Sequence, residues 1–155
     1  MSLKPIAYFA CALLWGLFST QASAYDCSIS ATPLNFGAIQ GIAGMVQRST
    51  ATITVVCSGG ASAANVSYRI LIDGPAAQAP RQISSGSHSA SYQLYTSGDY
   101  QQVWGNGGGG VITDSYSLEA NAAVTRTYTV YAKMTPSRND PPGSYIANAM
   151  VQLIY

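Results

Sequence analysis

The segment Thr50-Ala-Thr-Ile-Thr-Val-Val-Cys57 decides the fold class of this chain. Ala51, Ile53, Val55 and Cys57 alternate with threonines over most of its length. A period of two places the apolar side chains on one face of a β-strand and the polar ones on the other. The β-branched residues also favour a pleated strand. The segment therefore predicts a strand with one buried face, onto which the Cys57 side chain points.

The same alternation recurs elsewhere in the chain, in residues 66–72, 128–134 and 145–155 and briefly at Tyr92 and Leu94. No segment after residue 24 has a convincing helical period. Short strands separated by turn-forming residues are typical of a β-sandwich, so the sequence predicts one all-β domain. The turn formers are Ser58-Gly59-Gly60, Asp73-Gly74-Pro75, 104–110 and 139–143.

The N-terminal residues have the pattern of a signal peptide. Lys4 precedes an apolar stretch at 6–18, and Ala22-Ser23-Ala24 ends in the small-x-small pattern that signal peptidase accepts. The alternative, a membrane anchor, needs about 18–20 apolar residues in a row, and this stretch is shorter. We therefore expect residues 1–24 to be a signal peptide, residues 25–155 to be the mature domain, and no stable membrane anchor to remain.

Cleavage after Ala24 determines which cysteines remain. Cys11 leaves with the signal peptide, whereas Cys27 and Cys57 stay in the mature chain. An even number of cysteines in an exported chain indicates a disulfide, and closing this loop would stabilise the fold by about 3–4 kcal/mol. A metal site needs more ligands than these two cysteines and the single histidine, His88, provide. We expect a disulfide, no metal and no cofactor.

The charges exclude one class of partner. The chain has seven Lys and Arg residues, one of them Lys4 in the predicted signal peptide, against six Asp and Glu residues. The mature chain is therefore close to neutral, and the sequence has no basic patch to neutralise phosphates. Nucleic acid is not expected as a partner.

No set of residues indicates catalysis. His88 lies in a polar segment without a Gly-x-Ser-x-Gly nucleophile motif. The glycines at 107–110 lack the lysine and the following helix of a phosphate-binding loop. The acidic residues are scattered and form no close pair for acid and base roles. We assign no catalytic residue and expect that the protein is not an enzyme.

Aromatic residues gather in one stretch, and two interpretations of them stay open. Tyr95, Tyr100 and Trp104 follow Tyr92 closely, and exposed aromatic residues are favoured at recognition surfaces. In the first interpretation these three residues contact an external surface. In the second, Tyr92 belongs to the core and the other three cover one end of the sandwich.

Several motifs follow one another in a specific order and spacing along the chain. They are Cys27-Ser-Ile-Ser-Ala-Thr-Pro-Leu-Asn-Phe-Gly37, 50–57, Tyr68-Arg-Ile-Leu-Ile-Asp-Gly74, Arg81, Tyr92-Gln-Leu-Tyr95, Val103-Trp-Gly-Asn-Gly107, Tyr128-Thr-Val-Tyr-Ala132 and Gly143-Ser-Tyr145. Together they resemble the spore coat protein U domain family, which includes the pilins of archaic chaperone–usher pili. The resemblance covers essentially all of residues 27–155.

The resemblance implies an immunoglobulin-like sandwich that lacks one strand. A periplasmic chaperone would lend that strand during export through an outer-membrane usher, and a neighbouring pilin subunit would later replace it at the cell surface. A self-contained secreted coat or binding protein is the alternative. The implied groove is bordered by the first strand and by the inward-facing residues of the last strand, namely Tyr145, Ala147, Ala149, Val151, Leu153 and Tyr155.

One departure from the resemblance concerns the donor segment. Fibre-forming pilins of this type carry a donor segment of a dozen or so residues before the first cysteine. Here only Tyr25 and Asp26 would precede Cys27, and two residues span at most ~7 Å. We therefore expect a subunit that accepts a strand but donates none, at the tip of a fibre or outside a fibre.

Overall fold

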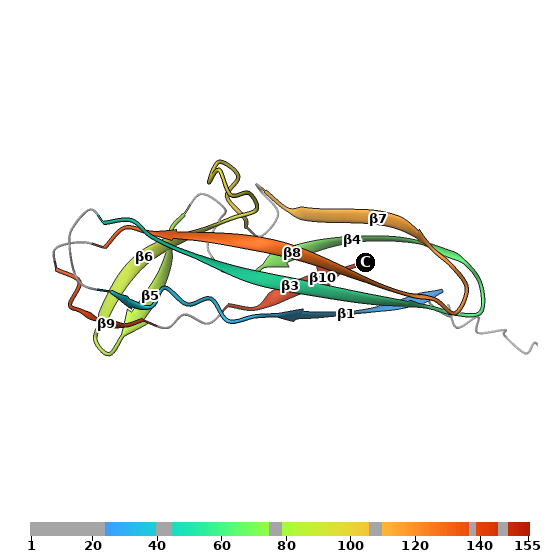
Figure 1. Cartoon of the computed structure of the whole chain (residues 1–155), viewed down its shortest axis with the longest axis horizontal. Helices are drawn as coiled ribbons and strands as arrows, with labels where there is room; N and C mark the ends of the chain where they lie inside the picture. The colour runs from blue at the N-terminus through green and yellow to red at the C-terminus, as the bar shows by residue number, and fades with distance from the viewer. Residues whose placement is uncertain (1–23, 40–44, 75–78, 106–109, 137–138, 146–148) are drawn as a thin grey trace, which may run out of the picture.

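The structure is a computed structural model, and it describes residues 24–39, 45–74, 79–105, 110–136, 139–145 and 149–155. These residues form an elongated pair of β-sheets without a helix, as Figure 1 shows. The strands are β1 (Tyr25–Ala31), β2 (Ala38–Ile39), β3 (Gln47–Gly59), β4 (Ala64–Ile72), β5 (Arg81–Ser85), β6 (His88–Tyr95), β7 (Ile112–Leu118), β8 (Ala123–Met134), β9 (Gly143–Ser144) and β10 (Val151–Ile154).

The strands form two antiparallel sheets that pack face to face. The larger sheet has the order β1-β3-β8-β6-β5, the smaller one has the order β10-β4-β7, and β2 pairs with β9 as a separate two-stranded ribbon. β5, β6 and β9 lie toward one end of the long axis, β4 and β7 extend toward the other, and β10 lies near the middle (Figure 1). The predicted all-β sandwich is confirmed.

β3 and β8 form the central pair of the larger sheet. Their register places Ala51 opposite Val130 and Ile53 opposite Tyr128. The inward side chains of the predicted strand at 50–57 are buried from Ile53 onward, and Val55 and Cys57 are fully buried. The period of two in this segment therefore predicted the buried face correctly.

The predicted disulfide between Cys27 and Cys57 is present. The two residues lie directly opposite each other in the antiparallel pair of β1 and β3. Cys57 is fully buried, and Cys27 packs against the same core. The bond therefore fastens the first strand to the centre of the larger sheet.

The C-terminal region differs from the single strand predicted over 145–155. It contains β9 and the short strand β10, while the predicted groove residue Ala147 lies outside the described residues. β10 pairs with β4 from Val151, which lies opposite Ile72, the last residue of β4. Beyond the end of β4, the Asp73 amide still donates to the Met150 carbonyl.

The predicted turn former Asp73-Gly74 does not join two paired strands as in a hairpin. It leads from β4 in the smaller sheet to β5 in the larger sheet, and these strands are not paired. The guanidinium of Arg81 holds the turn, because Nη1 donates a hydrogen bond of 2.6 Å to the Asp73 carbonyl. Gly74 has a φ of 115°, and a Cβ there would lie 2.7 Å from that Nη1. The turn therefore crosses between sheets and requires glycine.

Candidate functional site: an apolar groove between the first and last strands

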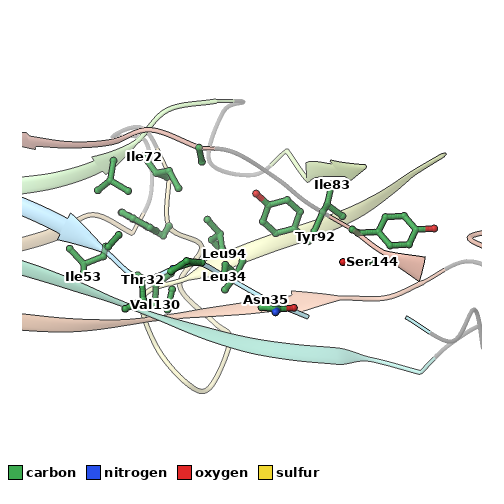
Figure 2. Close-up of a pocket in the computed structure, with 17 residues that line it drawn as sticks. Thr32, Leu34, Asn35, Ile53, Ile72, Ile83, Tyr92, Leu94, Val130 and Ser144 are labelled. Atoms are coloured by element: carbon green, nitrogen blue, oxygen red, sulfur yellow. The ribbon is translucent and has the colours of Figure 1, made fainter. Parts of the chain in front are cut away.

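A cavity of about 590 Å³ opens between the two sheets. Its floor is apolar and comes mainly from the larger sheet, with Ile53 from β3, Leu94 from β6 and Val130 from β8 among its members. Figure 2 shows these side chains gathered around one space. The remaining lining residues are Ala31, Thr32, Pro33, Leu34, Asn35, Ala51, Ile72, Ile83, Tyr92, Trp104, Ser144, Tyr145, Ala149 and Val151.

One wall of the groove is the chain that leaves β1. Beyond Ala31, the Thr32 amide donates to the Thr52 carbonyl (2.9 Å), and the Thr32 hydroxyl accepts a hydrogen bond from the Thr52 amide (2.8 Å). The Ser49 hydroxyl donates to the Asn35 carbonyl. These bonds hold residues 32–35 beside β3. The opposite wall comes from the C-terminal region, through Tyr145, Ala149 and Val151.

Both strands beside the groove have an edge without a partner in the described part of the chain. β1 is the last strand of the larger sheet, and β10 is the last strand of the smaller one. Such edges present backbone N–H and C=O groups that can pair with an added strand. The apolar floor lies beyond Ala31 and Val151, between the chain that leaves β1 and the C-terminal region, so alternate side chains of an added strand that continues along these edges could fill it.

The gap between β1 and β10 is closed at one end by the C-terminal residue. The Tyr155 hydroxyl donates to the Asp26 carboxylate over 3.1 Å. The rings of Tyr25 and Tyr155 lie 5.7 Å apart. The cavity lies beyond Ala31, on the side away from this contact.

The start of β10 is fixed by the turn that follows β4. The Asp73 amide donates to the Met150 carbonyl (2.9 Å), and the Met150 amide donates to the Asp73 carboxylate (2.6 Å). Asp73 is in turn held by Arg81, which is only 6% exposed. The position of Val151 at the groove thus depends on a buried guanidinium.

The predicted groove residues that the structure describes divide into two groups. Tyr145, Ala149 and Val151 line the cavity, whereas Leu153 and Tyr155 lie outside it, and Ala147 is not described. The sequence prediction did not name the floor residues. They lie on β3, β4, β5, β6 and β8 and on the loop that holds Trp104, and only the stacking of the two sheets brings them together.

The three aromatic candidates occupy different environments. Trp104 is 2% exposed and lines the groove, and its indole N–H donates to the Ile70 carbonyl over 3.1 Å. Tyr95 is 8% exposed beneath Tyr100, whose ring is 5.3 Å away. A buried ring cannot contact an external surface, so the surface-contact hypothesis does not extend to Trp104 or Tyr95. Tyr100 is partly exposed.

A chain of hydroxyl groups joins the sheets on the side opposite the groove. The Tyr68 and Tyr128 hydroxyls are 2.6 Å apart, and the Tyr128 hydroxyl donates to the Asp114 carboxylate over 2.7 Å. Arg126 lies 3.5 Å from the same carboxylate. Burial, together with the hydrogen bonds to Tyr68 and Asp114, raises the pKa of Tyr128 well above its ordinary value.

This network predicts a loss of stability in alkali. Burial also raises the pKa of Tyr68 and of Tyr116, so the unfolded chain releases these protons first as the pH rises. The free energy of unfolding should therefore fall as the pH rises above about 10. Tyr128→Phe should lower the free energy of unfolding by about 1–3 kcal/mol at pH 7 and make the alkaline fall shallower, as measured by urea denaturation from neutral to alkaline pH.

Tyr131→Phe is the matched control for Tyr128→Phe. It removes a hydroxyl from the same strand, and this hydroxyl forms no hydrogen bond with any described residue. The control should leave both the neutral stability and the alkaline slope unchanged. Equal slopes for the native chain and Tyr128→Phe would contradict the role assigned to the network.

Two further features of the described residues bear on function. No helix in the described ranges is long and apolar enough to span a bilayer. Over the same ranges, His, Cys, Asp and Glu side chains form no group of three that could hold a metal ion.

The sequence matches the Spore Coat Protein U domain over residues 16–151, which is most of the chain. No curated protein matches it. The Spore Coat Protein U domain is associated with archaic chaperone–usher pilins and is structural rather than catalytic. This chain belongs to the Spore Coat Protein U domain family.

Proposed function

We propose that this protein is an exported structural or adhesive subunit of a cell-surface fibre, assembled by the chaperone–usher route through donor-strand complementation. The apolar groove of about 590 Å³ between the chain that leaves β1 and the C-terminal region carries the proposal. Its partners would be a periplasmic chaperone, an outer-membrane usher and other pilin subunits.

One added strand would meet two needs of this sandwich together. The edges of β1 and β10 need hydrogen-bond partners, and the apolar floor needs cover from water. An extended segment with alternate apolar residues supplies backbone groups to the edges and side chains to Ile53, Leu94 and Val130. A chaperone strand and a subunit strand can therefore occupy the same groove in turn.

The disulfide and the family support export. Disulfides persist in oxidising compartments such as the periplasm, and Cys27 and Cys57 are bonded in the described fold. The predicted signal peptide at 1–24 would direct the chain there. We propose passage through the periplasm and a final location at the cell surface.

The pairing of the first residues after the predicted cleavage site supports a tip position. Tyr25 and Asp26 pair with Gly59 and Ser58 within the larger sheet. They therefore serve the subunit's own fold and do not form a donor segment. With cleavage after Ala24, the subunit would accept a strand and donate none, as the distal subunit of a fibre does.

The alternative function is a self-contained secreted coat or binding protein. The contact between Tyr155 and Asp26 favours it, because it joins β1 to the end of β10 without any partner chain. In that case the groove would stay open or bind a ligand other than a strand.

Co-purification with a periplasmic chaperone tests the proposal. The tagged mature chain should form a stable one-to-one complex, and without the chaperone it should aggregate or be degraded. Ala51→Phe should lower the yield of complex by roughly tenfold or more, because the larger ring fills the space that the incoming strand needs. Thr52→Phe is the control, since Thr52 is exposed and does not line the groove.

A second groove variant guards against misfolding of Ala51→Phe. Val151→Lys puts a charge on the groove wall at a partly exposed position, where the side chain can reach water only while the groove is empty. A soluble monomer that folds cooperatively without the chaperone would favour the self-contained protein. The intact mass of the purified chain tests the tip position, which fails if a donor segment precedes Tyr25.

A further inference from the structure

A second hollow, of about 550 Å³, lies on the flank of the sandwich opposite the groove. It is bounded by the loop at 96–102, the start of β7 and the middle of β8. In Figure 1 this loop stands beside the start of β7. Its lining is mainly Ser, Thr, Gln and Tyr and includes no charged side chain among the described residues. It therefore differs in chemistry from the apolar groove.

The hollow exists because β6 is shorter than β8. The last residue of β6, Tyr95, lies opposite Tyr131, so the residues of β8 before Tyr131 have no partner on that side among the described strands. Thr127 and Thr129 lie in this part of β8, and Thr113 on β7 lines the same hollow. The side chains of these three threonines are exposed and form no hydrogen bond within the described part of the chain.

The loop beside the hollow is held in one conformation. The Thr96 amide donates to the Gln102 carbonyl over 2.9 Å, and their side chains lie 3.2 Å apart in a second hydrogen bond. The Ser97 hydroxyl and the Gln101 amide donate to the Asp99 carboxylate, and these bonds lower the pKa of Asp99. A site built on such a loop loses little entropy when a ligand binds.

An aromatic ring forms one end of the hollow. Tyr131 is partly exposed, and its ring packs edge-on against Tyr100 with centroids 6.2 Å apart. Gly98 lies so close that a Cβ there would be 3.1 Å from the Tyr131 ring. Tyr100 itself has a φ of 59°, a conformation that is costly for a residue with a side chain and that clusters at functional sites.

From these features we propose that the hollow binds a neutral saccharide. Its volume lies within the range of small-ligand sites. Hydroxyl groups both donate and accept hydrogen bonds, so Thr113, Thr127 and Thr129 match the hydroxyls of a sugar, and the Tyr131 ring offers an apolar surface to its C–H face. A charged ligand would find no counter-charge in this lining, and an apolar ligand would leave the threonine hydroxyls buried without partners. This inference does not depend on the fibre.

Titration with neutral disaccharides tests the inference. The mature chain, in whatever complex it is purified, is titrated with cellobiose, maltose, lactose and mannobiose up to roughly 20 mM, since weak saccharide sites have Kd values near the millimolar range. We expect saturable binding of at least one disaccharide, and the four probes separate glucose-type from galactose- and mannose-type ligands. Any partner protein present is titrated alone and should not bind.

Variants of β8 locate the site. Replacing Thr127 and Thr129 together by valine keeps the side-chain shape and removes two hydroxyls, so binding should weaken roughly tenfold or more. Thr125→Val is the control, because Thr125 is exposed on the same strand but lies outside the hollow. Valine suits a strand, and an unchanged thermal midpoint shows that the fold persists.

Three outcomes would overturn the inference. The first is no saturable binding of any of the four disaccharides. The second is equal weakening by Thr125→Val and by the double variant. The third comes from titrating glucuronate beside glucose. It is binding of glucuronate that is as tight as, or tighter than, that of glucose, because a neutral lining offers the carboxylate no counter-charge.

Discussion

Replacing both Cys27 and Cys57 by alanine should lower the free energy of unfolding by about 3–4 kcal/mol. The two cysteines are 30 residues apart in sequence, and the bond limits the freedom of the unfolded chain between them. A domain of this size is stable by about 5–15 kcal/mol, so the loss is a large fraction of the total. Urea denaturation of the two proteins under oxidising conditions measures the difference.

Reduction provides the control for the cysteine variant. Addition of dithiothreitol to the native protein should reproduce the stability of the double variant and should leave the double variant itself unchanged. A loss below about 1 kcal/mol would contradict the role of the bond in holding β1 to β3. Because the chain after β1 forms one wall of the groove, the reduced protein should also lose affinity for an added strand.

The sequence predicted the strands whose inward side chains are all apolar. In β3, Ile53, Val55 and Cys57 face the core as the period of two indicated. The register of β1 and β3 then explains why the disulfide could be predicted as well, because Cys27 lies opposite Cys57. Where composition and period agree, the local sequence is sufficient to predict a strand and its buried face.

Two of the strands that the sequence did not predict, β5 and β7, turn a charged residue inward. β5 buries Arg81, which is satisfied by the Asp73 carbonyl. β7 turns Asp114 toward the other sheet, where Tyr128 donates to it. In each case the partner comes from a distant strand or turn. The pattern of a single sequence cannot show that such a charge has a hydrogen-bond partner, so the segment is predicted to be a loop.

The groove could be predicted only along its C-terminal wall. The family resemblance pointed to Tyr145, Ala149 and Val151, which do line the cavity. The floor depends on how the two sheets stack, and a local sequence pattern does not show which strands lie against one another. Trp104 illustrates the difficulty, because it follows the exposed loop at 96–102 and precedes a run of glycines, yet it is buried.

Trp104→Ala should lower the free energy of unfolding by about 3–5 kcal/mol, the range for removing a buried large aromatic side chain. The indole is 2% exposed, and its N–H is bonded to the Ile70 carbonyl. Trp104→Phe retains most of the ring and loses this hydrogen bond, so it should cost less, about 1–3 kcal/mol. Chemical denaturation of the native chain and both variants gives the three values.

Tyr100→Ala is the comparison that separates a core role from a surface role. Tyr100 is partly exposed, so its replacement should cost clearly less than that of Trp104. If Trp104→Ala left the stability unchanged, the tryptophan would not lie between the sheets and the groove would lose part of its lining. If the stability falls as expected while an added strand also binds more weakly, the same indole supports the fold and the groove. In that case the core of this sandwich extends directly into the surface that an added strand would cover.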